Sequence, residues 1–153
     1  MPNHKLKNRI EYVSFRIALA GLKLLPPEAA KAVLKGLFWF GGWVIGIRKN
    51  VALQQLSKIF PEKNSKEKAA IIKKLYRNMA LSIYECYLMD DETLYKNIRI
   101  EGREFIEEAL SLKRGAIFAT AHYGNWEAAR ILPKAGIPIS GIAKPQRNVL
   151  FDK

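Results

Sequence analysis

Apolar residues recur with helical spacing along the first part of the chain. Residues 5–25 carry a broad apolar stripe, which predicts an amphipathic helix that ends at Pro26 and Pro27. Residues 28–47 predict a second helix whose last part is an uncharged aromatic run. A short third helix is predicted over residues 49–59. The N-terminal third of the chain is therefore expected to be helical.

A capping box marks the start of the next predicted helix. Asn64 is a favourable N-cap residue, and Glu67 lies three positions further on, where its side chain can bond back to the cap. From there, apolar residues recur on one face as far as about Met89. The acidic run at residues 90–92 is expected to be a solvated turn.

Beyond residue 96 the pattern changes to short apolar segments that alternate with helical ones. Strands are predicted over residues 97–101, 116–121 and 137–143, the second of them uncharged and suited to burial. Helices are predicted between them over residues 103–113 and 125–135. This alternation implies a parallel sheet with right-handed crossovers. The predicted fold class is α/β, with N-terminal helices followed by a partial parallel sheet with flanking helices.

Positive charge and apolar character coincide in the first fifty residues. The chain of 153 residues has a formal net charge of +12, and residues 1–50 carry nine Lys or Arg against two acidic residues. Cations among bulky side chains, as at residues 35–40, are typical of a membrane interface and favour an anionic lipid surface over nucleic acid. We expect residues 1–50 to be membrane-associated helices and residues 51–153 the first part of an α/β domain. A core pair of helices would explain the same apolar positions.

Membrane spans and export signals are not apparent in this region. No run of eighteen apolar residues occurs, so the sequence predicts no clear spanning helix. Arg16 and Lys23 interrupt the apolar stretch that a secretory signal would need. The rest of the chain is therefore expected on the cytoplasmic side.

The best candidate chemistry follows the second predicted strand, residues 116–121. His122 comes directly after it, Gly124 permits a tight turn, and Asn125 is a good N-cap. On one continuous helix, five positions turn through about 500°, which leaves two side chains about 140° apart. If the chain turns first, Glu127 falls in the first helical turn and can accept a proton from one imidazole nitrogen. The other nitrogen would then serve as a base.

Simpler explanations exist for each of these residues taken singly. Glu127 would also complement its helix dipole, His122 would also suit a loop, and Trp126 would also suit a core. The sequence contains no G-x-S-x-G, Walker A or G-x-G-x-x-G motif, and H-x-x-x-x-E is not the H-E-x-x-H of zinc enzymes. One cysteine, Cys86, excludes an intramolecular disulfide. Together, the residues at this junction favour a functional site.

Four segments, in order, give the chain a specific resemblance. Residues 115–127, Gly-Ala-Ile-Phe-Ala-Thr-Ala-His-Tyr-Gly-Asn-Trp-Glu, resemble the H-x-x-x-x-E block of the lipid A biosynthesis lauroyl/myristoyl acyltransferases. Residues 48–62 resemble that family's arginine–asparagine to phenylalanine–proline segment. Residues 100–102 resemble the strand before its next helix, and residues 143–148 its arginine–proline–asparagine segment. The resemblance implies a glycerolphosphate acyltransferase-like α/β fold.

This resemblance also implies an activity. Members transfer a fatty acyl chain from acyl carrier protein to a hydroxyl group of a lipid A-type glycolipid precursor, a step in lipopolysaccharide biosynthesis. By position, His122 would be the general base and Glu127 the residue that orients it. Lys144, Arg147 and Asn125 are the candidate substrate-binding residues. No metal or cofactor is expected, because the acyl thioester is already activated.

Location and partners follow from the same resemblance. The implied partners are acyl carrier protein, anionic membrane lipid and the glycolipid acceptor, at the cytoplasmic face of the inner membrane. Nucleic acid is not expected as a partner.

Family members are longer than this chain, which is expected to correspond to the N-terminal half of an enzyme. Lys144 also stands where the family usually has arginine. Two other functions remain open: a catalytically inert, membrane-binding remnant of the family, and a basic nucleic-acid-binding module.

Overall fold

The computed structural model describes residues 2–121, 123–142 and 144–151. Two compact units make up the chain. One unit comprises residues 20–88, and the other comprises residues 1–19 together with residues 89–153. Helix α1 (Pro2–Lys23) confirms the first predicted helix and contributes most of its length to the second of these units.

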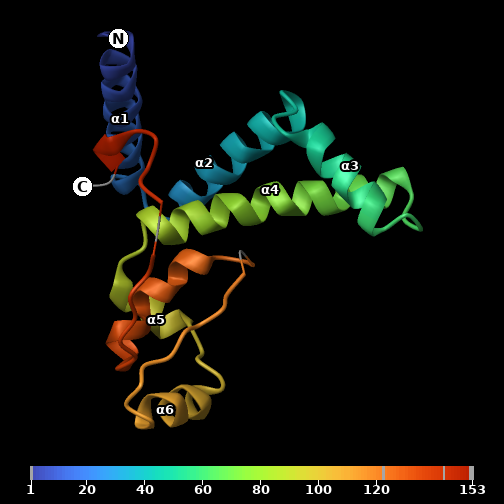
Figure 1. Ribbon diagram of the computed structural model, residues 1–153. Helices are drawn as coiled ribbons and strands as arrows, with labels where there is room; N and C mark the ends of the chain where they lie inside the picture. The colour runs from blue at the N-terminus through green and yellow to red at the C-terminus, as the bar shows by residue number, and fades with distance from the viewer. Residues whose placement is uncertain (1, 122, 143, 152–153) are drawn as a thin grey trace. The chain divides into compact units, whose positions relative to one another are not determined.

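The unit of residues 20–88 is built on one long helix, α4 (Ser65–Tyr87), with α2 (Pro27–Trp39) and α3 (Lys49–Ile59) packed along it (Figure 1). A π-helical turn, η1 (Phe40–Val44), ends α2. Buried residues at a spacing of four give α4 the continuous apolar face that covers α2. The core residues of this unit are Ala30, Leu34, Ile72, Tyr76, Ala80 and Tyr84.

The capping box predicted at the start of α4 is confirmed. Asn64 Oδ1 accepts a hydrogen bond of 3.0 Å from the Glu67 backbone N–H, and Glu67 Oε2 accepts one of 2.8 Å from the Asn64 N–H. The reciprocal bonds satisfy two backbone donors that have no partner inside the helix. The first turn of α4 is thereby fixed at the residue that the sequence predicted.

Asn64→Ala is expected to lower the free energy of unfolding by about 1 kcal/mol, because the cap hydrogen bond is lost. Urea denaturation followed by circular dichroism would measure the difference. Asn50→Ala, an exposed position in the first turn of α3, is the matched control and should change stability little. Equal losses in both variants would contradict a specific role for the cap.

The second unit contains shorter helices. These are α5 (Asp91–Asn97), α6 (Arg103–Ser111), η2 (Trp126–Ala135) and a final turn, η3 (Val149–Phe151). The acidic run at residues 90–92, predicted as a solvated turn, is instead the start of α5. Asp90 caps that helix by accepting a hydrogen bond from the Thr93 backbone N–H.

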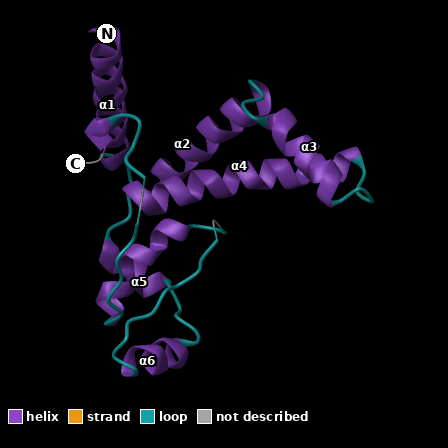
Figure 2. Cartoon of the chain, viewed as in Figure 1, coloured by secondary structure: helices purple, strands orange, loops and turns teal. Residues whose placement is uncertain are grey.

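The α/β prediction is wrong for the described part of the chain, which contains helices and loops but no strand (Figure 2). Residues 98–101, 116–121 and 137–142 lie outside regular structure, and Asn97 is the last residue of α5. Ala143, the last residue of the third predicted strand, is not among the described residues. The predicted parallel sheet is therefore absent from the described residues.

Missing backbone pairing explains the error. An apolar or alternating pattern favours an extended backbone, but a strand exists only where neighbouring backbone groups form a ladder. Ile117, in the segment predicted to be a buried strand, and Ile142, in the third predicted strand, are fully exposed. Without a paired neighbour, residues 116–121 are exposed along their whole length. Ile137, at the start of the third segment, is buried without taking part in a ladder.

No single described helix is long and apolar enough to cross a bilayer. Residues Pro27–Val44 and Lys49–Ile59 meet the length and composition requirements together, although the pair bends by 77° between them.

Candidate active site

The turn predicted after residues 116–121 is present. The Tyr123 backbone N–H donates a 2.8 Å hydrogen bond to the Ala121 carbonyl oxygen, and Gly124 has a φ of 62°. That positive φ is accessible to glycine at little cost, which explains the residue at this position. His122, the predicted base, lies outside the described residues.

The helix predicted over residues 125–135 is confirmed in extent, but it is a 3-10 helix, η2, and not an α-helix. Asn125 occupies the N-cap position without a side-chain capping bond, so the predicted capping role of its side chain is wrong. Instead, the Asn125 carbonyl oxygen accepts from the Ala128 N–H at 3.1 Å. Pro133 has no N–H and weakens the α-helical ladder, while Gly136, with a φ of 76°, ends the helix as predicted.

Glu127 lies in the first turn of η2, as the spacing predicted. It is half-buried and lines a small cavity of about 180 Å³ with Trp126, Arg130 and Ile139. Trp126 is 50% exposed, so the alternative explanation of this residue as part of a core is wrong. The turn thus brings the carboxylate to a concave surface shared by η2 and residues 139–141.

Arginine and lysine side chains fasten η2 to α5. Arg130 Nε donates to Asp91 Oδ1 at 2.8 Å, and Arg130 Nη2 donates to the Met89 carbonyl oxygen at 3.1 Å. One turn further along η2, Lys134 pairs with Glu92. These contacts hold the helix that carries Glu127. The acidic run at residues 90–92 supplies the partners of both cations, although its sequence predicted only a solvated turn.

The α5 cap should make this unit sensitive to acid. The Thr93 backbone N–H, and next its hydroxyl, bond to Asp90 and lower the pKa of that carboxyl from its usual value of 3.8. A carboxyl whose pKa is lowered by folding stabilises the folded state above its unfolded pKa, and this contribution disappears as the pH falls through the folded pKa.

Amide hydrogen exchange in α5 is therefore expected to accelerate as the pH falls below about 4, beyond the intrinsic change in exchange rate. Asp90→Asn keeps a capping oxygen but does not titrate, so its α5 protection should depend less on pH. Glu108→Gln removes an exposed carboxylate of α6 and serves as the control. Identical pH profiles for Asp90→Asn and the parent would contradict the assignment.

Lys144 and Arg147 are exposed, and neither lines the cavity beside Glu127. The following residue, Asn148, was not predicted to matter structurally, yet it is 7% exposed. Its Nδ2 donates to the Asn8 carbonyl oxygen of α1 at 2.8 Å, and its Oδ1 accepts from the Leu150 N–H at 3.2 Å. Asn148 thereby anchors the segment that carries the two cations to α1.

Comparison with known sequences tests the family resemblance of the chain as a whole. Residues 4–153 match the sequence model of a family described as bacterial lipid A biosynthesis acyltransferase. The chain belongs to this family. The match confirms the resemblance found in the motifs, and it covers nearly the whole chain as those motifs predicted.

Individual proteins of the lipid A acyltransferase family also match the chain, at an identity below 30%. The chain is 28% identical over 142 residues to lipid A biosynthesis myristoyltransferase of Escherichia coli (strain K12), covering 88% of this chain and 43% of the relative. It is 27% identical over 143 residues to lipid A biosynthesis acyltransferase 2 of Shigella flexneri, covering 88% and 44%. The chain thus spans less than half the length of these relatives. No solved structure matches it.

Proposed function

We propose that the protein transfers a fatty acyl chain from acyl carrier protein to a hydroxyl group of a lipid A-type glycolipid precursor. Membership of the lipid A biosynthesis acyltransferase family supports this proposal. The observation that carries it is the tight turn at Gly124, which puts Glu127 in the first turn of η2 beside a cavity, five positions after His122.

The proposed chemistry assigns each site residue a task. His122 removes the proton from the acceptor hydroxyl as its oxygen attacks the thioester carbon, and the carrier thiol leaves. Glu127 orients the imidazole and stabilises its protonated form. The thioester is already activated, so the reaction requires no covalent enzyme intermediate and no cofactor. Holding donor and acceptor together supplies much of the remaining rate acceleration.

Positive charge supports the proposed binding partners. Lys144 and Arg147 are exposed cations that would contact phosphate groups of the acceptor, and Asn125 stands at the entrance to η2. The surplus of Lys and Arg in residues 1–50 favours docking on anionic lipid. The proposed location is the cytoplasmic face of the inner membrane.

A second candidate is a catalytically inert protein of the same family that binds membranes. The unpaired, exposed segments around Ile117 and Ile142 favour it, because a sheet would otherwise hold the candidate base rigidly. In this case the basic helices would retain lipid binding while transfer is lost.

One experiment separates these functions. Purified chain is incubated in mixed micelles with acyl carrier protein loaded with a radiolabelled acyl chain and with a lipid A-type glycolipid precursor. Labelled lipid is then resolved by thin-layer chromatography. Time-dependent labelling is expected. Absence of labelling together with sedimentation on anionic vesicles would instead support the inert membrane-binding protein. Tight, salt-sensitive binding to DNA or RNA without vesicle binding would overturn both.

A further inference from the structure

A second, larger cavity lies in the unit of residues 20–88. It has a volume of about 440 Å³, within the range of about 300–1,000 Å³ that is usual for small-molecule sites. Residues of α2, η1, α3 and α4 line it, and all but one of the non-glycine side chains among them are apolar or aromatic. The lining includes Leu37, Phe38, Ile47, Ala52, Leu75 and Met79.

A tyrosine forms the floor of this cleft. The Tyr76 hydroxyl donates a 2.7 Å hydrogen bond to the Ile47 carbonyl oxygen, so its polar atom is satisfied and its ring presents an apolar surface. The walls remain open to solvent, since Leu37 is 59% exposed and Met79 is 45% exposed. The cleft is therefore a formed apolar groove that a ligand could enter without unfolding the unit.

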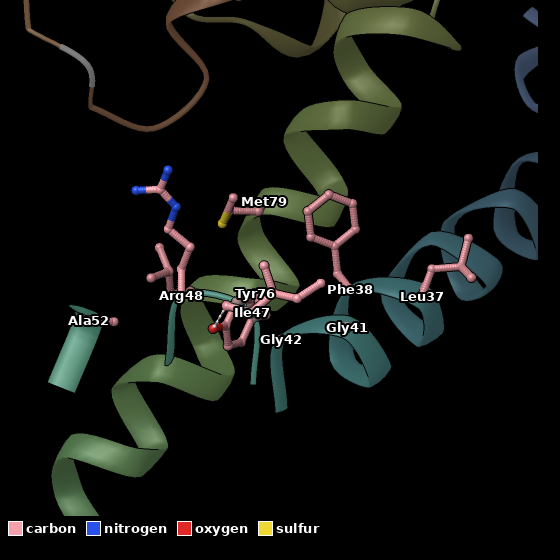
Figure 3. Close-up of a pocket in the computed structure, with 10 residues that line it drawn as sticks. Leu37, Phe38, Gly41, Gly42, Ile47, Arg48, Ala52, Tyr76 and Met79 are labelled. Carbon is pink, nitrogen blue, oxygen red and sulfur yellow. Dashed lines mark hydrogen bonds between the residues drawn. The ribbon is translucent and has the colours of Figure 1, made fainter. Parts of the chain in front are cut away.

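Arg48 provides the single charge in this lining (Figure 3). Its side chain lies, with Ala52, on the side of the labelled set opposite Leu37 (Figure 3). Its backbone has a φ of 59°, which is uncommon for a residue other than glycine. In the part of the chain that the structure describes, no carboxylate forms an ion pair with its guanidinium.

Two further cations lie near the same turn. Lys49 and Lys73 both approach the ring of Trp43, with their Nζ atoms 4.0 Å and 4.3 Å from its centroid. The ring attracts each ammonium group through a cation–π interaction, but it carries no negative charge that would neutralise them. Positive charge from Lys49 and Lys73 therefore gathers around Trp43, in the turn that precedes α3, although neither lysine lines the cleft.

We infer that this cleft is a specific site for one anionic phospholipid, with an acyl chain among the apolar side chains and the phosphate on Arg48. An alkyl chain suits a groove whose polar groups are already satisfied, and a guanidinium suits phosphate geometry. The site lies outside the H-x-x-x-x-E junction, contains none of its residues, and does not depend on acyl transfer. It differs from general adsorption to a charged surface because it holds one lipid in one orientation.

Monomeric lysolipids test the site in the absence of a membrane surface. The intact chain is titrated by calorimetry with lauroyl lysophosphatidylglycerol below its critical micelle concentration. Two comparison ligands are lauroyl lysophosphatidylcholine, which has a headgroup without net charge, and glycerol phosphate, which has no acyl chain. Saturable binding of one lysophosphatidylglycerol per chain is expected, with weaker binding of lysophosphatidylcholine. Comparable binding of glycerol phosphate would show a site for free phosphate and overturn the inference.

Variants separate the charge from the groove. Arg48→Gln is expected to weaken lysophosphatidylglycerol binding about tenfold or more. It should weaken lysophosphatidylcholine binding less, because the choline ammonium already neutralises the phosphate that both lysolipids carry. Lys58→Gln, an exposed position on α3 with the same charge change, should leave both unchanged. If both variants weakened lysophosphatidylglycerol binding equally, the effect would come from the net charge of the chain, and a specific site would be contradicted.

Filling the groove should abolish binding of both lysolipids. Ala52→Phe inserts a ring from α3, and Gln55→Phe places the same ring on an exposed position of that helix as the control. Circular dichroism checks the fold, and Leu75→Phe, a lining position on α4, replaces Ala52→Phe if that variant is unfolded. Undiminished binding in a folded, filled variant would place the lipid elsewhere and overturn the inference.

Discussion

Replacing His122 by alanine is expected to lower the rate of acyl transfer by about 10²–10⁴-fold, the contribution typical of a positioned general base. The acceptor hydroxyl would then have to lose its proton to water as it attacks the thioester. Binding of acyl carrier protein and acceptor should survive, because the imidazole acts on the reacting proton and not on the rest of the substrates. Initial rates with labelled donor, measured at saturating acceptor, give the comparison.

Glu127→Gln provides the complementary measurement. Glutamine keeps the shape of the side chain but removes the negative charge that would orient and stabilise the imidazolium. We expect a large loss in kcat with little change in KM, and partial recovery in Glu127→Asp. Glu104→Gln, an exposed glutamate in the first turn of α6, should retain full activity. Unchanged transfer in both His122→Ala and Glu127→Gln would remove these residues from the mechanism.

Gly42→Ala is expected to cause the largest loss of stability, about 2–4 kcal/mol, by combining overpacking with a lost hydrogen bond. A Cβ atom at this buried position would lie 2.5 Å from Cγ of Tyr76 and closer still to two other ring carbons. The ring cannot swing aside without releasing its hydrogen bond to the Ile47 carbonyl oxygen. Chemical denaturation of the intact chain would measure the change.

Two variants separate the contributions to this loss. Gly36→Ala, in the interior of α2, meets no atom within 4 Å and should stabilise the helix by about 0.5–1 kcal/mol. Tyr76→Phe keeps the ring and removes only its hydroxyl, so it should cost about 1 kcal/mol. If Gly42→Ala were as stable as Gly36→Ala, the close packing of η1 against α4 would be contradicted.

Local signals in the sequence predicted the helical part of the chain well. The capping box at Asn64 and Glu67, the predicted helix over residues 49–59, and the helix end at Gly136 are all present. Each depends on residues within a few positions of one another, so no tertiary information was needed. The candidate site was predictable in part for the same reason: the turn at Gly124 places Glu127 by local geometry.

Features that depend on distant residues were missed or wrong. The ion pair between Arg130 and Asp91 spans 39 positions, and the Asn148 bond to α1 spans 140, so neither has a local signature. The apolar cleft beside Arg48 depends on three helices meeting at a π-helical turn. The spacing of residues along one helix does not predict such a cleft, because the cleft depends on how different helices pack together.

By itself, the sequence determined the family, the helices that carry their own caps and apolar faces, and the order of residues from His122 to Glu127. Tertiary structure decided whether an extended segment becomes a strand. It left residues 116–121 and 137–142 unpaired among the described residues, with Ile117 and Ile142 exposed. The physical reason is that a helix satisfies its backbone hydrogen bonds within its own segment, whereas a strand depends on the backbone of another segment.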